Sequence, residues 1–482
     1  MVPSHEVRGG LRARRARGAD RAERLRRRRG RRRRPHLPRR REVLPVSAAA
    51  TWSNWGRTAT CRPERVITPQ NVERLAAEIA AAAERGATVK PVGAGHSFSE
   101  IAVAPQTQVN LSGLRGLLDV DAAQRRVTLG AGTHLYQIPP LLDPHALAMA
   151  NLGDVDRQTV SGATSTGTHG TGLAFGGIST QIVGAQLVDG TGQIHDFGDD
   201  DPELKAVALG LGALGVLTRL TLQCVDAFAI EAHEAPASAD EAIDTFLDRC
   251  AAYDHYEFYW FPHTDCALTK RNTRLPADAP VSGPGKVRRY IDDELLSNGV
   301  YRALCAFSAA VPAVVPGINQ VSGRVLSART YTDRSDKVFV SSRTVRFREM
   351  EYAIPLAAVP EALRELRTTI ERRGHKVSFP VEVRAAAADD LMLSTASGRE
   401  SGYLAVHRYH RDSPAASEAY FRDVEDIMTA HGGRPHWGKM HTRDADYLRS
   451  VYPRFDDFLA LRDRLDPQRT FANPYLRRVL GE

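Results

Sequence analysis

The sequence has few cysteines and no long hydrophobic run, and each scarcity excludes a class of protein. Only five of the 482 residues are cysteine, their spacing is irregular, and no Cys-x-x-Cys pair occurs. Such a set is typical of reduced thiols in a cytoplasmic protein and not of a disulfide framework or a zinc site. No apolar run reaches the roughly 18 residues of a membrane span, because Pro312 and Pro316 interrupt the most apolar patch. We therefore expect no stable membrane span, and a peripheral membrane association stays open.

Acidic residues are scarce only at the N-terminus. Residues 1–42 contain 18 arginines and four acidic residues, a net charge of +14, whereas the whole chain carries +8. The rest of the chain therefore carries a net charge of −6. We predict a disordered Arg-rich leader over residues 1–47, because a stretch without apolar periodicity cannot bury enough surface to fold. A nucleic-acid-binding arm and a transit or twin-arginine signal are the alternatives. The acidic body argues against a nucleic-acid partner.

A dinucleotide-binding pattern occurs in the wrong context. Residues 210–215 read Gly-Leu-Gly-Ala-Leu-Gly, but a Rossmann fingerprint needs a strand before its glycines and a helix after them. Here a predicted helix at 202–209 comes first and a predicted strand at 216–224 follows. We interpret the glycines as a tight connection whose bare backbone can approach a ligand closely.

Two loops rich in glycine and hydroxyl groups offer a different cradle. The first loop, residues 93–99, follows a predicted strand at 88–92. The second, residues 164–172, ends a segment from Thr159 that contains almost no bulky side chain. Unobstructed backbone N–H groups with Ser and Thr donors are what pyrophosphate binding outside a Rossmann fold requires. Each loop holds a histidine. His96 could be a base, a hydrogen-bond donor, a covalent attachment nucleophile or an ordinary turn residue, and His169 is interpreted as structural.

The pattern of predicted strands and helices changes at about residue 227. From there to residue 434, predicted strands, among them 338–340 and 377–383, mix with amphipathic helices, which favours an α+β domain on an antiparallel sheet. Glu382 and Arg384 lie two apart on a predicted strand, so both point to one face. They could bind a polyhydroxylated substrate, and a weak surface salt bridge is the alternative.

Further on, His407 shares a strand face with Tyr409, and residues 436–441 combine a tryptophan, a lysine and two histidines. The spacing of that segment is irregular and carboxylates are few nearby, so we expect no metal site. A cationic cluster that stabilises an anion is the better interpretation.

Four segments in this order resemble a known family: Val-Gly-Ala-Gly-His-Ser-Phe at 92–98, Gly-Thr-His-Gly-Thr-Gly at 167–172, Leu-Gly-Val at 214–216 and His-Trp-Gly-Lys at 436–439. The chain resembles the aldonolactone oxidoreductases of the vanillyl-alcohol-oxidase superfamily. That group includes L-gulono-1,4-lactone dehydrogenase or oxidase and D-arabinono-1,4-lactone oxidase, and the actinobacterial dehydrogenase type is the nearest in appearance. The resemblance covers about residues 52–480, and His-Trp-Gly-Lys is its most specific element.

The resemblance implies an α+β, two-domain flavoprotein. An FAD-binding domain of the PCMH type would span residues 48–226, an inserted α+β cap domain would span 227–434 on its antiparallel sheet, and residues 435–482 would return to the FAD domain. In the family the His of the Gly-His-Ser loop can bind the flavin 8α carbon covalently, which corresponds to His96; some relatives hold FAD without a bond.

The resemblance also supplies site residues. The implied catalytic residues are Glu382, Arg384 and Lys439, with Lys439 near the flavin N1. A base must also take the hydroxyl proton, and Glu382 and His407 are the candidates, which completes the predicted catalytic set. The implied cofactor-binding set is Gly93, Ala94, Gly95, His96, Ser97, Ser161, Gly162, Thr166, Gly167, Thr168, His169, Gly170, Gly215, Val216, His436 and Lys439.

The expected reaction is oxidation of a sugar lactone by hydride transfer to flavin N5, giving ascorbate or an analogue. An alditol oxidase of the same fold is the alternative. The electron acceptor would be oxygen or a carrier of the cytochrome or quinone type. Oxygen access would depend on small residues around Ser161 and Gly162, and the resemblance favours a dehydrogenase.

Overall fold

A small parallel sheet opens the described part of the chain. The computed structural model describes residues 50–283, 301–341 and 345–482, so the predicted leader at 1–47 lies outside the described residues. The sheet has the order β3-β5-β4, and helix α1 follows its first strand. Asn71 begins the helix by accepting a hydrogen bond from the Arg74 amide at 2.9 Å. The bounds are β3 Arg65–Ile67, α1 Val72–Glu84, β4 Val89–Val92 and β5 Thr107–Asn110.

An antiparallel sheet of order β10-β9-β11-β7-β6 forms the second part of this half. Its bounds are β6 Leu117–Asp121, β7 Arg126–Gly130, β9 Ile182–Val188, β10 Ile194–Phe197 and β11 Val216–Gln223. Helix α4 (Leu204–Val207) precedes the three glycines at 210–215, and β11 follows them. The reversed order that excluded a Rossmann site is confirmed.

The segment 164–172 was expected to be a loop, and that prediction is wrong for its first three residues. Residues Val160–Thr166 form helix α3. The Thr159 hydroxyl accepts from the Gly162 amide at 3.2 Å, and the helix ends at Gly167, whose φ is +79°. Inside the helix the hydroxyl of Thr164 bonds back to the Val160 carbonyl at 3.0 Å, so poor helix formers are accommodated.

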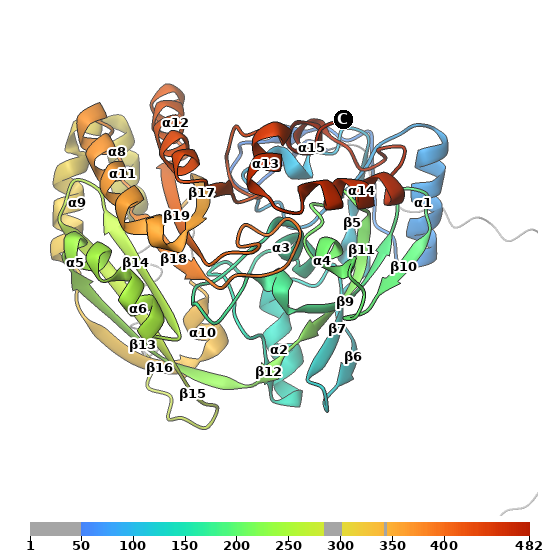
Figure 1. Cartoon of the computed structure of the whole chain (residues 1–482), viewed down its shortest axis with the longest axis horizontal. Coiled ribbons are helices and arrows are strands. Elements are labelled where there is room, and N and C mark those ends of the chain that lie inside the picture. The colour runs from blue at the N-terminus through green and yellow to red at the C-terminus, as the bar shows by residue number, and fades with distance from the viewer. Residues whose placement is uncertain (1–49, 284–300, 342–344) are drawn as a thin grey trace, which may run out of the picture. The chain divides into compact units, whose positions relative to one another are not determined.

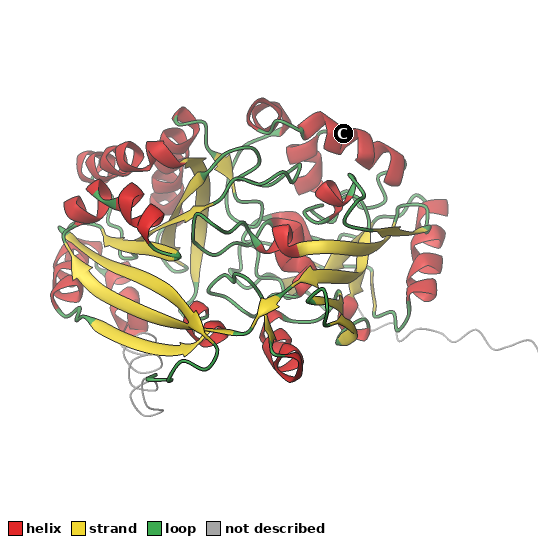
Figure 2. Ribbon diagram, turned by 60° about the horizontal axis from the view of Figure 1, so that its bottom comes forward, coloured by secondary structure: helices red, strands yellow, loops and turns green. Residues whose placement is uncertain are grey.

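An eight-stranded sheet dominates the rest of the chain, in the order β16-β13-β15-β14-β18-β19-β17-β20, and its neighbouring strands pair antiparallel. Helices cover one of its faces (Figures 1 and 2). Residues of β14 alternate: Phe258 and Trp260 pack into the core beneath these helices, while Glu257 and Tyr259 point to the opposite face. The strands are β13 Phe228–Ala237, β14 His255–Phe261, β15 Cys266–Pro276, β16 Arg329–Arg334, β17 Phe347–Pro355, β18 Val381–Ala386, β19 Ser401–Tyr409 and β20 Arg434–Pro435. The helices of this core are α5 Ala239–Asp244, α6 Phe246–Ala252, α11 Val359–Arg373 and α12 Pro414–Ala430. Helix α8 (Tyr301–Ala310) packs against Phe347 and Tyr409 in a separate cluster, and α9 (Val315–Arg324) follows it.

One predicted strand of this region is a helix. Residues 338–340 belong to the end of α10 (Ser335–Phe339) and the residue after it. Val338 and Phe339 are buried, and Phe339 packs edge-on to Phe228 and His255. Tertiary packing therefore overrides the β-propensity of this short apolar run.

The C-terminal segment returns to the first half. Helices α13 (Ala445–Val451), α14 (Phe455–Leu465) and α15 (Pro474–Leu480) lie over the first half of the chain at the top of Figure 1, and their buried residues share one hydrophobic core with α1, β7, β9 and β11. The Asn473 side chain donates to the carbonyls of Ile101 and Val103, both at 3.0 Å. The mixed α/β architecture with an antiparallel cap sheet is confirmed, while the domain boundaries stay predictions. No helix in the described ranges is long and apolar enough to cross a membrane.

The remaining elements are short. They are β1 Trp52–Ser53, β2 Thr60–Cys61, β8 Leu147–Ala148, β12 Val225–Asp226, α2 Ile138–Leu142 and the 3₁₀ turns Glu100–Ala102, Leu111–Gly113, Leu135–Gln137, Asp143–His145, Ile178–Gln181, Pro312–Val314 and Leu356–Ala358.

Candidate functional site

Two adjoining cavities meet at the glycine-rich loops: the first lies among these loops and the first half of the chain, and the second lies between the loops and the eight-stranded sheet. The first, here the loop cavity, has a volume of about 820 Å³, and the second, the sheet cavity, about 2500 Å³, both including their solvent-filled mouths. His96, Ser97, Gln158 and Thr166 line both, so the two are continuous.

The structure brings most of the sequence-predicted residues to these cavities. The loop cavity is lined by Gly93, Ala94, Gly95, His96, Ser97, Ser161, Gly162, Thr166 and Gly215. The sheet cavity is lined by His96, Ser97, Thr166, Thr168, His169, Glu382, Arg384, His436 and Lys439. Four predicted residues line neither cavity: Gly167, Gly170, Val216 and His407.

The two motifs at 93–99 and 436–439 are joined directly. The Phe98 amide donates to the Gly438 carbonyl at 2.6 Å, and the Ser99 hydroxyl donates to the Trp437 carbonyl at 2.8 Å. Trp437 is fully buried, and its indole N–H donates to the Leu393 carbonyl at 2.7 Å. This anchor places Lys439 beside the histidine loop.

The sheet cavity has a charged wall built from alternate residues of three strands. Glu382 and Arg384 point from β18, with Arg384 Nη2 at 2.5 Å from Glu382 Oε1. Arg384 Nε also lies 2.7 Å from Glu257 Oε2 of β14. Glu382 and Arg384 are 4% and 8% exposed, so the alternative of a surface salt bridge is wrong. Burial opposes the charge of Arg384, but Glu382 and Glu257 outweigh it and raise its pKa well above the usual value.

Lys439 faces a second pair of carboxylates. Its Nζ lies 2.5 Å from Glu349 Oε1 and 3.9 Å from Glu351 Oε2, both on β17. Burial disfavours the ammonium, yet the two carboxylates raise the pKa of Lys439 above its usual value. Burial also disfavours ionised Glu349, but Lys439 and His407 outweigh it and lower its pKa to about 2.

His407 sits behind this wall and not in the cavity. Its Nε2 lies 3.6 Å from Glu349 Oε1, and its ring packs against Phe347 and Phe379. The geometry therefore does not favour His407 as a base that touches substrate, and its contact with the site runs through Glu349.

Comparison with known proteins fits this arrangement. Residues 220–479 match the D-arabinono-1,4-lactone oxidase family, and residues 63–198 match an FAD-binding domain. The chain belongs to the D-arabinono-1,4-lactone oxidase family. It is therefore an FAD-dependent oxidoreductase, as the resemblance implied.

Relatives cover nearly the whole described chain. L-gulono-1,4-lactone dehydrogenase of Mycobacterium tuberculosis is 42% identical over 433 residues, which is 89% of this chain and 99% of that protein. L-gulonolactone oxidase of Bos taurus is 32% identical, over 89% of this chain and 98% of that protein. Among solved structures, cholesterol oxidase from B. sterolicum has a TM-score of 0.75 at 19% identity and covers 92% of this chain and 99% of that chain, a likeness of fold.

The loop cavity fits the FAD of this family. The amides of Ala94, Gly95, His96 and Ser97 donate no hydrogen bond to any part of the chain that the structure describes. A Cβ on Gly93 would lie 2.4 Å from Thr159 Oγ1, and a Cβ on Gly215 would lie 2.5 Å from the Val188 carbonyl oxygen. Bare backbone with unpaired donors is the arrangement that receives an anionic group such as a pyrophosphate.

Lys90 is a buried cation in the loop cavity that the sequence did not single out. Its Nζ donates to the Gly212 carbonyl at 3.0 Å. Burial lowers the pKa of Lys90 to about 7, although Asp466 works in the opposite direction. A lysine within an otherwise apolar strand was the available signal.

His96 connects the cavities. Its ring stacks on Trp55 at 5.9 Å. Burial, followed by the charges of Arg157, His134 and Lys439, lowers the pKa of His96 to about 4. The imidazole is therefore neutral at neutral pH and has a lone pair for a bond or a hydrogen bond.

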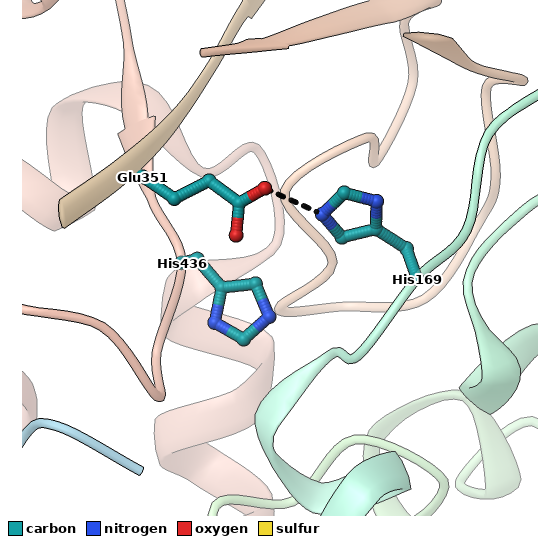
Figure 3. A group of neighbouring side chains, drawn as sticks. All are labelled: His169, Glu351 and His436. Atoms are coloured by element: carbon teal, nitrogen blue, oxygen red, sulfur yellow. Dashed lines mark hydrogen bonds and ion pairs between the residues drawn. The ribbon is translucent and has the colours of Figure 1, made fainter. Parts of the chain in front are cut away.

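His169, Glu351 and His436 form a cluster whose donor atoms lie within 4.8 Å of one another (Figure 3). His169 Nε2 lies 3.2 Å from Glu351 Oε1, and its Nδ1 lies 2.8 Å from the Gly170 carbonyl oxygen. Both ring nitrogens thus face oxygen acceptors. His436 Nδ1 accepts a hydrogen bond from the Gly438 amide at 3.0 Å. The neutral ring therefore carries its proton on Nε2, and neither nitrogen has a lone pair left for a metal ion. Lys439 near Glu351 also opposes a cation here, and we assign no metal.

Three carboxylates of the charged wall were missed by the sequence interpretation: Glu257, Glu349 and Glu351. Glu257 lies 127 positions before its partner Arg384, so no local pattern links them. The signal for all three was a carboxylate at alternate positions within an apolar or aromatic strand, at 255–261 and 347–355.

Proposed function

We propose that the protein oxidises an aldono-1,4-lactone at a secondary hydroxyl, with L-gulono- or D-arabinono-1,4-lactone as substrate. The product would be a 2-keto lactone, which enolises to ascorbate or an analogue. The observation that carries the proposal is the charged wall of Glu382, Arg384 and Lys439 directly beside the FAD-binding loop. The relatives named for these two lactones support the choice of substrate.

Bound FAD would supply the chemistry of the C–H bond, by taking a hydride at flavin N5. The chain's own residues would bind and orient the lactone. Carboxylate oxygens of the wall accept hydrogen bonds from sugar hydroxyls, and a hydrogen bond to a charged group contributes about 1.5–3 kcal/mol. Arg384 and Lys439 would provide fixed positive charge where negative charge develops.

Glu382 is the base that we propose for the hydroxyl proton. It lines the sheet cavity, it points from the same strand face as Arg384, and Tyr259 donates to its Oε1 at 3.4 Å. Glu257 then acts as a positioning residue, because it holds Arg384 Nε and leaves the rest of the guanidinium directed toward Glu382.

We also propose that His96 can form the covalent bond to the flavin. A neutral imidazole with a low pKa, placed in both cavities, has the required lone pair. Denatured protein that keeps its flavin through acid precipitation would support the bond, and a His96→Ala variant with noncovalent flavin would assign it. Complete release of flavin from the wild-type chain would contradict it.

Oxygen and a carrier of the cytochrome or quinone type remain the two proposed acceptors. Ser161 and Gly162, where oxygen access was predicted, line the loop cavity and not the sheet cavity. Ser161 is held by a hydrogen bond to the Ala131 carbonyl at 2.8 Å. Reoxidation in air after anaerobic reduction distinguishes an oxidase from a dehydrogenase.

The decisive experiment adds L-gulono-1,4-lactone to the full chain without oxygen and follows the flavin band near ~450 nm. Bleaching by the lactone supports the proposal. Bleaching by open-chain polyols alone would indicate an alditol oxidase, a relative of which is 28% identical to this chain. A protein that stays colourless after incubation with FAD would contradict the proposal as a whole.

A further inference from the structure

A group of basic side chains lies around His410, and one of its members contacts Trp55. Three chain segments contribute Arg57, Arg346, His410 and Arg411, here called the basic patch. Arg57 and Arg411 are exposed, and Arg346 and His410 are half-buried. His410 Nδ1 hydrogen-bonds to the Arg346 carbonyl oxygen at 3.0 Å. Burial lowers the pKa of His410, and Arg411, Arg346 and Arg57 lower it further, so the four groups lie within electrostatic reach of one another.

In the part of the chain that the structure describes, no ion pair compensates the arginines of the basic patch. None of the ion pairs among the described residues involves Arg57, Arg346 or Arg411. The neighbouring acid, Asp412, is buried and paired with Arg408 at 3.0 Å. Elsewhere on the surface arginines pair with acids at 2.6–2.7 Å: Arg125 with Asp226, Arg219 with Asp196, Arg334 with Asp143. A basic patch on a body of net charge −6 produces a local positive potential that can steer a partner.

One aromatic layer joins the basic patch to the site. The guanidinium of Arg346 lies 5.9 Å from the Trp55 ring centroid. Trp55 lines the sheet cavity and stacks on His96 at 5.9 Å with an interplanar angle of 21°. Phe98 and Phe347 pack edge-on to Trp55. The four basic residues themselves line neither cavity. A partner bound to them would therefore contact the surface and would not enter the cavities.

We propose that the basic patch is the docking surface of an acidic one-electron carrier protein that removes the electrons left by lactone oxidation. The proposal rests on the lactone-oxidising function proposed above. Conversion of a secondary alcohol to a ketone releases two electrons and two protons. Two carrier molecules accept one electron each, and both protons pass to solvent. Electrostatic complementarity of this kind sets the encounter rate and its dependence on salt.

The test reverses the charge of the basic patch by substitution and leaves the residues that line the cavities unchanged. The triple variant carries Arg57→Glu, Arg346→Glu and Arg411→Glu. A double variant keeps Arg346, because a charge reversal at this half-buried position could unfold the protein. A matched control reverses three arginines whose acidic partners are known: Arg125, Arg219 and Arg477. Anaerobic bleaching by L-gulono-1,4-lactone should proceed in all of them at the wild-type rate.

Binding is then measured by titration calorimetry with two probes, an acidic plant-type ferredoxin and a basic cytochrome c, at low and high salt. We expect the wild type and the control to bind the acidic probe, with affinity that falls as salt rises, and the patch variants to lose about tenfold or more. Equal binding by wild type and patch variants, or preference of the wild type for the basic probe, overturns the proposal. The patch variants could also be reoxidised more slowly by ferricyanide and yet bind the acidic protein as the wild type does. That result would indicate a site for small anions and would also overturn the proposal. If no protein bleaches with lactone while the binding pattern holds, the proposed function fails and the docking surface stands.

Discussion

The loop cavity and the sheet cavity are built by opposite means. The loop cavity is formed by glycine backbone and hydroxyl groups of segments that are each continuous in sequence, with Lys90 as its buried cation. The sheet cavity is walled by buried carboxylates and cations from strands that are distant in sequence. The loop cavity would bind its ligand through backbone that glycine leaves accessible. The sheet cavity would bind through charged side chains that are held in position by ion pairs with one another. Substitutions in the two regions should therefore fail differently.

The largest effect is expected in the sheet cavity. Lys439→Met should lower kcat by about 10²–10³, the typical loss when one fixed electrostatic stabiliser is removed, while FAD stays bound. Rapid-reaction kinetics of flavin bleaching and the flavin-to-protein ratio measure both. Lys205→Met, which removes a lysine paired with Asp390 at 3.1 Å on the surface, is the control and should leave both values unchanged. Loss of FAD together with kcat would contradict the separation of the two cavities.

The charge of the sheet cavity also gives a pH dependence. Burial, with contributions from Lys439 and His169, lowers the pKa of His436 to about 4 despite the opposing Glu351. The unfolded chain binds a proton at His436 below about pH 6.5, and the folded chain does so only near pH 4. The free energy of unfolding therefore falls as pH falls through this window, by roughly 3 kcal/mol from this group. Urea unfolding of wild type and His436→Asn at pH 7, 5 and 4 should show a shallower dependence in the variant, and parallel curves would argue against the assignment.

In the loop cavity the expected loss is one of cofactor affinity. Gly93→Ala places a methyl group 2.4 Å from Thr159 Oγ1, and overpacking of this kind costs about 1–3 kcal/mol. FAD affinity should fall by about fivefold to 150-fold, as measured by flavin fluorescence during reconstitution, and saturating FAD should restore kcat. Gly317→Ala, where an added Cβ meets no atom within 4 Å, is the control. A fall in kcat that FAD does not restore would mean that the loop also shapes the sheet cavity.

The smallest effect is expected behind the wall. His407→Asn removes a ring that touches the site through Glu349 at 3.6 Å, so kcat/KM should change by less than about tenfold, since a positioning contact of about 1 kcal/mol is at stake. Steady-state kinetics across pH would measure it. A loss as large as that of Lys439→Met would restore His407 as a group that acts on substrate.

The same contrast explains what the sequence could predict. The loop cavity was largely predictable, because glycine loops, the hydroxyl-rich segment and the His-Trp-Gly-Lys motif are local patterns. The charged wall was predicted only where two charges share one strand, at Glu382 and Arg384. Glu257, Glu349 and Glu351 join them through strand order, which no single strand encodes. Helices α3 and α10 were missed because Ser, Thr and Val have low helix propensity, which the Thr159 cap and the burial of Phe339 overcome.

The return of the C-terminal segment has a consequence for biosynthesis. The Val89 amide, at the start of the strand that leads into the histidine loop, donates to the carbonyl of Thr470 at 2.8 Å, and Asn473 holds the turn at 100–103. Strand β4 and the turn at 100–103 therefore lack these partners until residues 470–473 have been synthesised, and contacts of such large sequence separation form slowly. The first sheet of the nascent chain therefore stays incomplete until this segment has been made. Removal of helix α15 should leave a protein that does not bind its cofactor.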